Sequence, residues 1–118
     1  MKYFRLKIIT ESLSSKNKAI KLAEKIKEIL KLKIDFKIEI YHKFEDSYEI
    51  EFYDELYNTD IFIAKSIKMT AKICSPWSTT YHDNSGEIEL IFNKETSSLF
   101  QNPNFNTIKW AIFTVETV

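Results

Sequence analysis

Glycine, cysteine and arginine are scarce in this 118-residue chain, which has one of each: Gly86, Cys74 and Arg5. Loops that cradle phosphate groups need several glycines at fixed spacings, so nucleotide sites of the P-loop or Rossmann type are excluded. A lone cysteine has no partner within the chain, which excludes a disulfide scaffold. Because arginine is the usual reader of guanine edges and phosphate groups, its scarcity argues against a nucleic-acid interface.

Long apolar runs are missing as well. The N-terminal residues, MKYFRLKIITESL, alternate apolar and charged side chains and lack the apolar core of a signal peptide. No stretch approaches the length of a membrane span. We therefore expect a cytoplasmic protein that does not act at a membrane. Its length fits one domain, residues 1–118.

The first half of the chain predicts a strand, a helix and a second strand. Residues 3–10 alternate between apolar and polar side chains, as a half-buried strand does. Apolar residues then recur every three or four positions over about 15–32, which predicts an amphipathic helix with Ser14 or Ser15 as its N-cap. Residues 34–44 alternate again, and we expect their apolar row, which includes His42, to face the core.

The second half predicts further strands. Residues 61–74 fit either a strand or a helix, and we favour a strand over 65–75 that pairs with another at 87–93. One helical turn is expected near 97–100. The last run, TIKWAIFTVETV, is apolar on both faces and so belongs in the middle of a sheet. The pattern predicts an α+β fold: one long N-terminal helix packed on a largely antiparallel sheet of five or six strands.

The residues that could perform catalysis or hold a metal are few: His42, His82, Asp83 and Cys74. His82 and Asp83 are adjacent, which is not a spacing that recurs in metal sites. A Cys74–His82 pair could form because both residues border one loop, but no local signature supports it. We therefore predict no enzymatic activity, no cofactor and no metal; a small hydrolase or metal protein using these residues is the less favoured alternative.

The predicted helix is rich in lysine. Lys18, Lys21 and Lys25 form a line that could contact phosphates, which would suit a nucleic-acid-binding or regulatory domain. Glutamates are interleaved with these lysines, so ion pairs such as Glu24–Lys27 are also expected, as on an ordinary solvated helix. The second interpretation is favoured.

Negative charge is concentrated in residues 44–60, FEDSYEIEFYDELYNTD, which hold seven carboxylates and three tyrosines but no lysine or arginine. We expect a turn at 45–47, so that Phe44 lies opposite Tyr48, and Lys43 opposite Glu49. Phe44 and Tyr48 then belong to the core row. Carboxylates attract a basic partner, and tyrosine offers a large contact area with little loss of rotamer entropy.

The remaining acidic and aromatic residues predict a protein-binding surface, although an ordinary solvated loop is an equal alternative. The predicted partner-binding residues are Glu45, Asp46, Glu51, Tyr53, Asp54, Glu55, Tyr57, Asp60 and Trp77. Trp77 lies in a long loop, where it could either anchor a partner or cover the core.

A small cytoplasmic α+β domain without catalytic residues and with an acidic–aromatic surface resembles the immunity proteins of bacterial contact-dependent inhibition and related polymorphic toxin systems. KWAIFTVE at 109–116 is similar to the tryptophan-bearing C-terminal strand of such domains. The resemblance is one of type, covers the whole chain and transfers no functional residue. It implies a module that binds and neutralises a cognate protein toxin, for which a basic domain such as a nuclease is expected.

Overall fold

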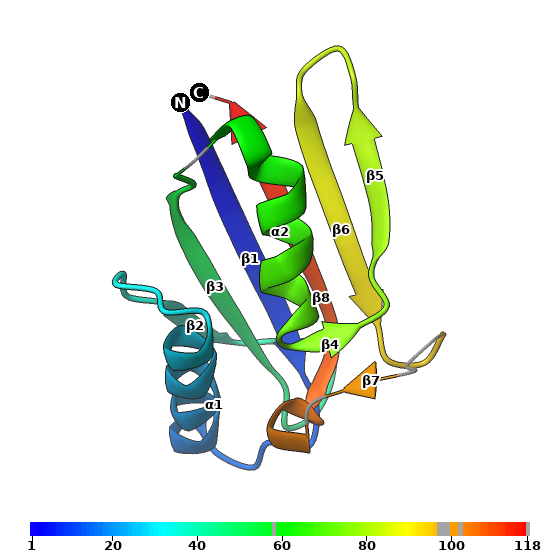
Figure 1. Ribbon diagram of the computed structural model, residues 1–118. Helices are drawn as coiled ribbons and strands as arrows, with labels where there is room; N and C mark the ends of the chain where they lie inside the picture. The colour runs from blue at the N-terminus through cyan, green and yellow to red at the C-terminus, as the bar shows by residue number, and fades with distance from the viewer. Residues whose placement is uncertain (58, 97–99, 102, 118) are drawn as a thin grey trace.

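The computed structural model describes residues 1–57, 59–96, 100–101 and 103–117. The elements are β1 (Lys2–Thr10), α1 (Lys16–Ile29), β2 (Lys37–Ile40), β3 (Tyr48–Glu55), η1 (Thr59–Ile61), α2 (Phe62–Ala71), β4 (Cys74–Ser75), β5 (Ser78–His82), β6 (Glu87–Asn93), β7 (Phe100–Gln101), η2 (Pro103–Phe105) and β8 (Ile108–Thr117). Six strands form an antiparallel sheet in the order β2-β3-β1-β8-β6-β5, while β4 pairs with β7. Both helices lie on one face of the six-stranded sheet (Figure 1).

Strand β8 lies in the middle of the sheet, as its apolar pattern predicted. Ala111, Phe113 and Val115 are buried on the side that carries the helices. Trp110 and Ile112 point to the opposite side and are half-buried. The core therefore lies between the sheet and the two helices, and β1 and β8 contribute to it along their whole length.

The predicted architecture with a single long N-terminal helix is wrong, because the structure has two short helices and the sheet dominates the fold. α1 begins where predicted, with Ser15 as its N-cap. It ends at Ile29 because Lys31 adopts a left-handed conformation, with φ of 56°. The N–H of Leu32 then donates to the Lys27 carbonyl (2.9 Å) in a Schellman ending. Glycine usually occupies this position, so a lysine there hid the end of the helix.

The strand predicted over 65–75 is also wrong, since most of this segment lies in α2. The buried side chains of α2 include Ser66 and Thr70, whose hydroxyls donate to carbonyls one turn earlier in the helix (2.7 and 3.0 Å). Small, internally bonded side chains let the helix approach the sheet closely. Ile63 and Ile67 fit the apolar pattern of both a strand and a helix over residues 61–74, but they are 37% and 47% exposed.

The hairpin formed by β2 and β3 has a longer loop than predicted. Ile40 lies opposite Tyr48, so the loop spans residues 41–47 and the predicted register is wrong. Phe44 and His42, which were expected in the core row, are exposed.

The strand predicted over 87–93 is confirmed as β6, but its neighbours are β5 and β8. The helical turn predicted near 97–100 falls largely outside the described residues, among which Phe100 begins β7.

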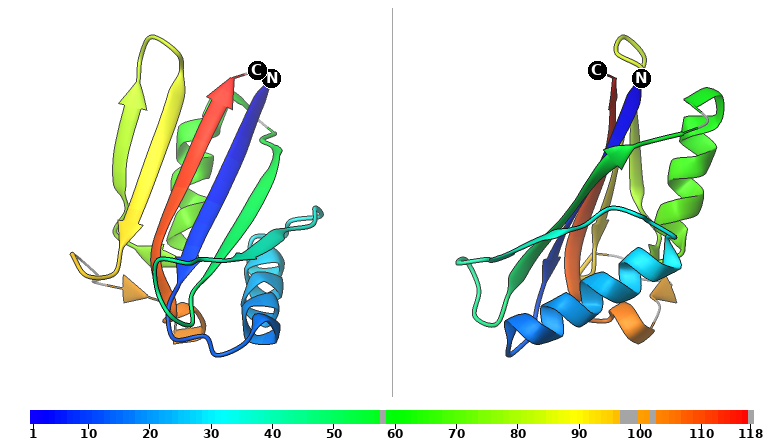
Figure 2. Two further views of the ribbon diagram at one scale, coloured as in Figure 1. Left: turned by 180° about the vertical axis from the view of Figure 1, so that it is seen from behind. Right: turned by 90° about the vertical axis from the view of Figure 1, so that its left-hand side faces the viewer.

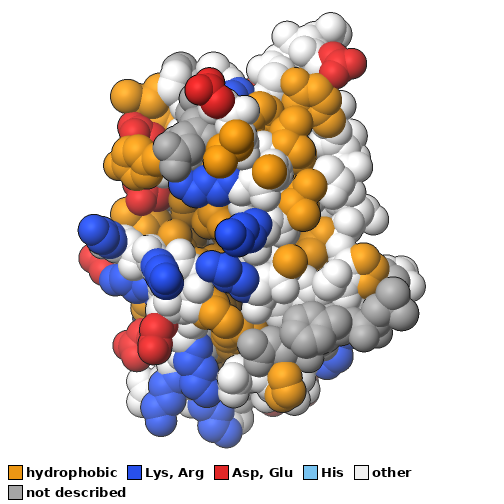
Figure 3. Space-filling view, in the orientation of Figure 1, with side chains coloured by type: hydrophobic (Ala, Val, Ile, Leu, Met, Phe, Trp, Pro, Cys, Tyr) orange, Lys and Arg blue, Asp and Glu red, His pale blue; other side chains and the backbone are white. Residues whose placement is uncertain are grey.

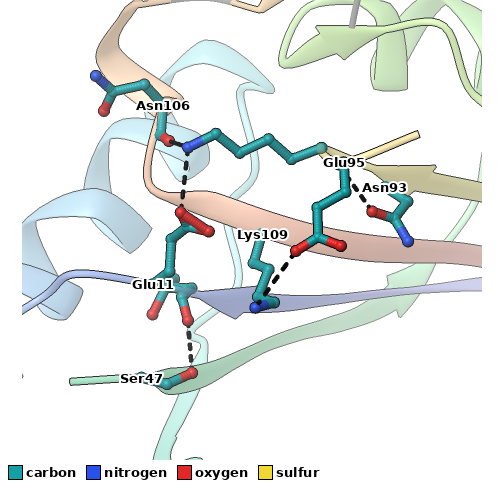
Figure 4. A network of polar contacts seen from close by, with 8 residues as sticks. Glu11, Ser47, Asn93, Glu95, Asn106 and Lys109 are labelled. Carbon is teal, nitrogen blue, oxygen red and sulfur yellow. Dashed lines mark hydrogen bonds and ion pairs between the residues drawn. The ribbon is translucent and has the colours of Figure 1, made fainter. Parts of the chain in front are cut away.

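Polar contacts connect neighbouring segments at the end of the sheet where β1 terminates (Figure 4). The ammonium group of Lys94 donates to the Glu11 carboxylate (3.2 Å) and to the Asn106 carbonyl (2.7 Å). On the other side of β1, the buried hydroxyl of Ser47 donates to the carbonyl of Thr10. The Ser47 bond holds the loop before β3 against the end of β1, which explains why the hairpin turns where it does.

Candidate functional site

The two faces of the sheet differ in what covers them. α1 and α2 cover one face, and Figure 2 shows the other face free of helices. Residues directly opposite one another in antiparallel strands point to the same face, so the register identifies the side chains on this open face.

Tyr53 makes aromatic and cation–π contacts on the open face. Its ring stacks on Tyr3 with centroids 5.5 Å apart, and the Arg5 guanidinium lies 4.8 Å from its centroid. Loss of water around the ring, followed by the charge of Glu116 and a hydrogen bond to it, raises the pKa of the Tyr53 phenol. The ring nevertheless stays 41% exposed. The neighbours therefore hold a tyrosine side chain in place while leaving much of it available for contact.

Neighbouring strands neutralise two of the acidic residues of β3. Arg5 Nε lies 2.8 Å from the Glu51 carboxylate, and Lys7 Nζ lies 3.5 Å from that of Glu49. The predicted pairing of Lys43 with Glu49 is wrong, because β1 and not the predicted hairpin partner supplies the cation. Glu51 is likewise paired, although the sequence suggested that it was unneutralised.

The open face still carries more acidic than basic side chains. Glutamates reach it from four strands, β2, β3, β6 and β8, whereas its lysine and arginine side chains that the register identifies come from β1 and β2. By register, the glutamates are Glu39, Glu49, Glu51, Glu55, Glu87, Glu89 and Glu116, and the cations are Arg5, Lys7 and Lys37. Sequence reasoning missed the glutamates of β6 and β8, although the alternation of Glu87 and Glu89 with apolar residues was visible.

The structure divides the predicted acidic–aromatic set. Glu51, Tyr53 and Glu55 point to the open face. Glu45 and Asp46 lie in the loop before β3, at the opposite end of a strand about 23 Å long. These five predicted residues therefore do not form one compact cluster.

Two other predicted residues, Asp54 and Tyr57, lie on the helix side of the sheet. The carboxylate of Asp54 accepts a bond from the Glu55 N–H (2.7 Å). Asp60 is exposed in η1.

Trp77 lies against the core on the helix-covered side. Its indole N–H donates to the Cys74 carbonyl (2.8 Å) and the Thr70 carbonyl (3.1 Å), and its ring packs 5.8 Å from that of Phe92. The side chain is half-buried. This geometry joins the end of α2 to β6, and it is that of a residue that covers the core.

A groove of about 860 Å³ lies on the helix side, between the end of α1, the end of β3 and α2. Apolar side chains that line it include Phe4, Leu30, Leu56 and Met69. Its lysines are Lys31, Lys33, Lys65, Lys68 and Lys72; Asp54 contributes a carboxylate, while Glu55 borders the groove but points by register to the open face. Figure 3 shows lysine side chains on both sides of this hollow, with hydrophobic surface between them. We call it the lysine-rimmed groove.

The candidate catalytic residues do not come together. Cys74 is fully buried in β4, and this burial raises the pKa of its thiol to about 12. His82 is exposed at the end of β5, where its ring lies 3.9 Å from the Glu89 carboxylate. Asp83 follows it in an exposed turn. Among the described residues, no group of three or more His, Cys, Asp or Glu side chains could hold a metal ion.

Neither helix, as far as the chain is described, has the length and apolar character needed to cross a bilayer. No protein-family model, curated protein or solved structure matches the chain.

Proposed function

We propose that the protein is a non-catalytic binding module that neutralises a cognate protein toxin by forming a tight complex. The observation that carries this proposal is the Tyr53 stack, an exposed aromatic side chain that Tyr3 and Arg5 hold in place. A rigid tyrosine binds with little loss of conformational entropy, which is why such side chains are enriched in protein interfaces. The open face around it is the proposed contact surface.

The size and charge of the open face suit a protein partner. Six strands spaced about 4.8 Å apart, and from about 13 to about 33 Å long, give a projected area on the order of 600–700 Å². A stable interface takes about 800 Å² from each partner, so this face and the adjoining loop could supply most of it. Its excess of carboxylates would attract a basic partner and raise the association rate.

The resemblance to immunity proteins supports a protein toxin as the partner. In such a system the chain acts in the cytoplasm, where it blocks a toxin domain before that domain can act. A basic nuclease domain would complement the acidic open face.

The proposal is tested by expressing the chain together with the toxin domain encoded beside it and measuring cell growth. We expect the native chain to restore growth and Tyr53→Ala/Glu116→Lys to lose this protection. The control is Tyr81→Ala/Glu24→Lys, which makes the same chemical changes at exposed residues away from the open face. No protection by the native chain would contradict the function, and equal protection by both variants would contradict the surface.

An alternative function uses the lysines of α1. Lys18, Lys21 and Lys25 are exposed and line a small depression of about 230 Å³, where nucleic-acid phosphates could bind. Titration with DNA and RNA at about 50 mM and about 200 mM salt tests this possibility, because phosphate contacts predict a steep loss of affinity. Binding that does not weaken with salt would contradict it.

A further inference from the structure

The lysine-rimmed groove is a gap in the layer of helices. α1 crosses the sheet near β2 and β3, and α2 lies in front of β1 and β8, so the far end of β3 has no helix in front of it (Figure 1). Phe4 and Leu56 line the groove at that place but are only 2% exposed. Its exposed apolar surface therefore comes mainly from Tyr57, Ile61 and Met69. A further helical segment laid there would complete the layer and bury this surface.

Positive charge is distributed along both walls of the groove. Lys31 and Lys33 follow α1. Lys65 and Lys68 lie in α2 and Lys72 directly follows it, so these three lysines extend over eight residues, or about 10 Å. In the described part of the chain, none of these five lysines forms an ion pair. Lys65 donates instead to a backbone carbonyl, that of Tyr57 (3.0 Å).

This arrangement favours one kind of occupant over two others. An acyl chain with a single anionic head would need cations at one end of the groove, whereas here they follow both walls. A membrane is flat, whereas the site is concave with its apolar surface between the lysines. An amphipathic helix with carboxylates on both flanks of an apolar stripe matches the shape and the charges.

We propose that the lysine-rimmed groove binds an acidic amphipathic helical segment of a protein partner. The apolar stripe of the segment lies on Tyr57, Ile61 and Met69, and its carboxylates pair with the lysines of the two walls. The inference rests on the proposed function to the extent that the partner is a protein. It adds a second contact surface, opposite in charge to the open face.

The probe is a fluorescent peptide of about 14 residues, four helical turns, with leucines on one face and glutamates on both flanks. A peptide of the same composition with a scrambled order lacks the stripe and is its control. Fluorescence anisotropy with the full chain measures the affinity of each. We expect the striped peptide to bind at least about tenfold more tightly than the scrambled one, with backbone amide shifts concentrated around the groove.

Three variants locate the binding. Lys31→Glu/Lys68→Glu should weaken it by about tenfold or more, because it reverses one charge on each wall. Lys18→Glu/Lys25→Glu makes the same change in net charge elsewhere on α1 and should leave the affinity within about twofold. Ala64→Trp fills the groove without changing the charge and should also weaken binding.

Equal binding of the two peptides, or equal loss in the two charge-reversal variants, would overturn the proposal. Binding of decanoate, or of vesicles that contain phosphatidylserine, in preference to the striped peptide would overturn the assigned class of ligand. The growth assay keeps this inference separate from the proposed function. Protection that survives Lys31→Glu/Lys68→Glu but not the Tyr53 variant would contradict the groove alone, whereas failure of the native chain to protect would contradict the function.

Discussion

Replacing Trp77 by phenylalanine separates the two roles that the sequence allowed this residue. The substitution keeps an aromatic ring near Phe92 but removes the indole N–H, which donates to the carbonyls of Thr70 and Cys74 at 3.1 and 2.8 Å. A hydrogen bond of this kind contributes about 0.5–1.5 kcal/mol, and one shared donor serves both carbonyls. We therefore expect Trp77→Phe to lower the free energy of unfolding by about 1–2 kcal/mol.

The assay is urea denaturation followed by far-ultraviolet circular dichroism, which does not depend on tryptophan fluorescence. For a chain of this length the expected loss corresponds to roughly 3–6 °C in Tm for each kcal/mol. Trp110→Phe is the matched control, because in the described part of the chain the Trp110 indole makes no hydrogen bond. That variant should lose less stability than Trp77→Phe.

The same two variants also report on binding. If Trp77 covers the core, Trp77→Phe still protects cells in the growth assay at temperatures where it is folded. Unchanged stability together with lost protection would refute the reasoning and identify Trp77 as an anchor for the partner.

Three further predictions concern stability. Burial raises the pKa of the Cys74 thiol from 9.0 to about 12, so the unfolded chain ionises first and stability should fall as the pH rises above 9. Denaturation at pH 8 and pH 10.5 should show a loss on the order of 1–2 kcal/mol that is absent from Cys74→Ala; equal losses would contradict this cause. Thr10→Val removes the hydroxyl that accepts from the Tyr48 N–H (2.9 Å) and should cost about 1–3 kcal/mol, measured by urea denaturation, whereas no loss would show that water replaces this bond. Gly86→Ala should cost about 1–2 kcal/mol because φ is +66° there, and the nearest atom to the new methyl group, Lys2 Nζ at 3.4 Å, can move; an unchanged Tm would contradict this origin.

Much of the sheet could be predicted because a period of two in the sequence is a local signal. The first strand, the strand at 87–93 and the central position of β8 all follow from it. The two helices were harder to predict for physical reasons. Lys31 adopts a conformation that glycine usually takes, and α2 buries Ser66 and Thr70 while it exposes its isoleucines.

The candidate site could be predicted only in part. Tyr53, Glu51 and Glu55 do share one face, as alternation along a strand requires. Their neighbours on that face come from β1 and β8. β1 lies next to β3, and β8 lies one strand further on; both positions depend on the strand order of the sheet. No pattern within residues 44–60 could have shown that Arg5 pairs with Glu51.

The position of the hairpin turn depends on a tertiary contact. Ser47 is buried because its hydroxyl donates to the end of β1, and Asp46 has a positive φ of 51° beside it. The sequence of the hairpin alone favoured a tighter turn. Glu45 and Asp46 lie in this loop, at the end of β3 opposite Glu55.

The most direct test of the central claim is calorimetric titration of the purified chain with the toxin domain encoded beside it. The account predicts a tight one-to-one complex whose affinity falls by about 100-fold in Tyr53→Ala/Glu116→Lys, since a buried interface tyrosine contributes at least about 2 kcal/mol. Tyr81→Ala/Glu24→Lys should bind as the native chain does. No complex with the native chain, or an unchanged affinity in the Tyr53 variant, would contradict the claim that this open face of the sheet neutralises a toxin.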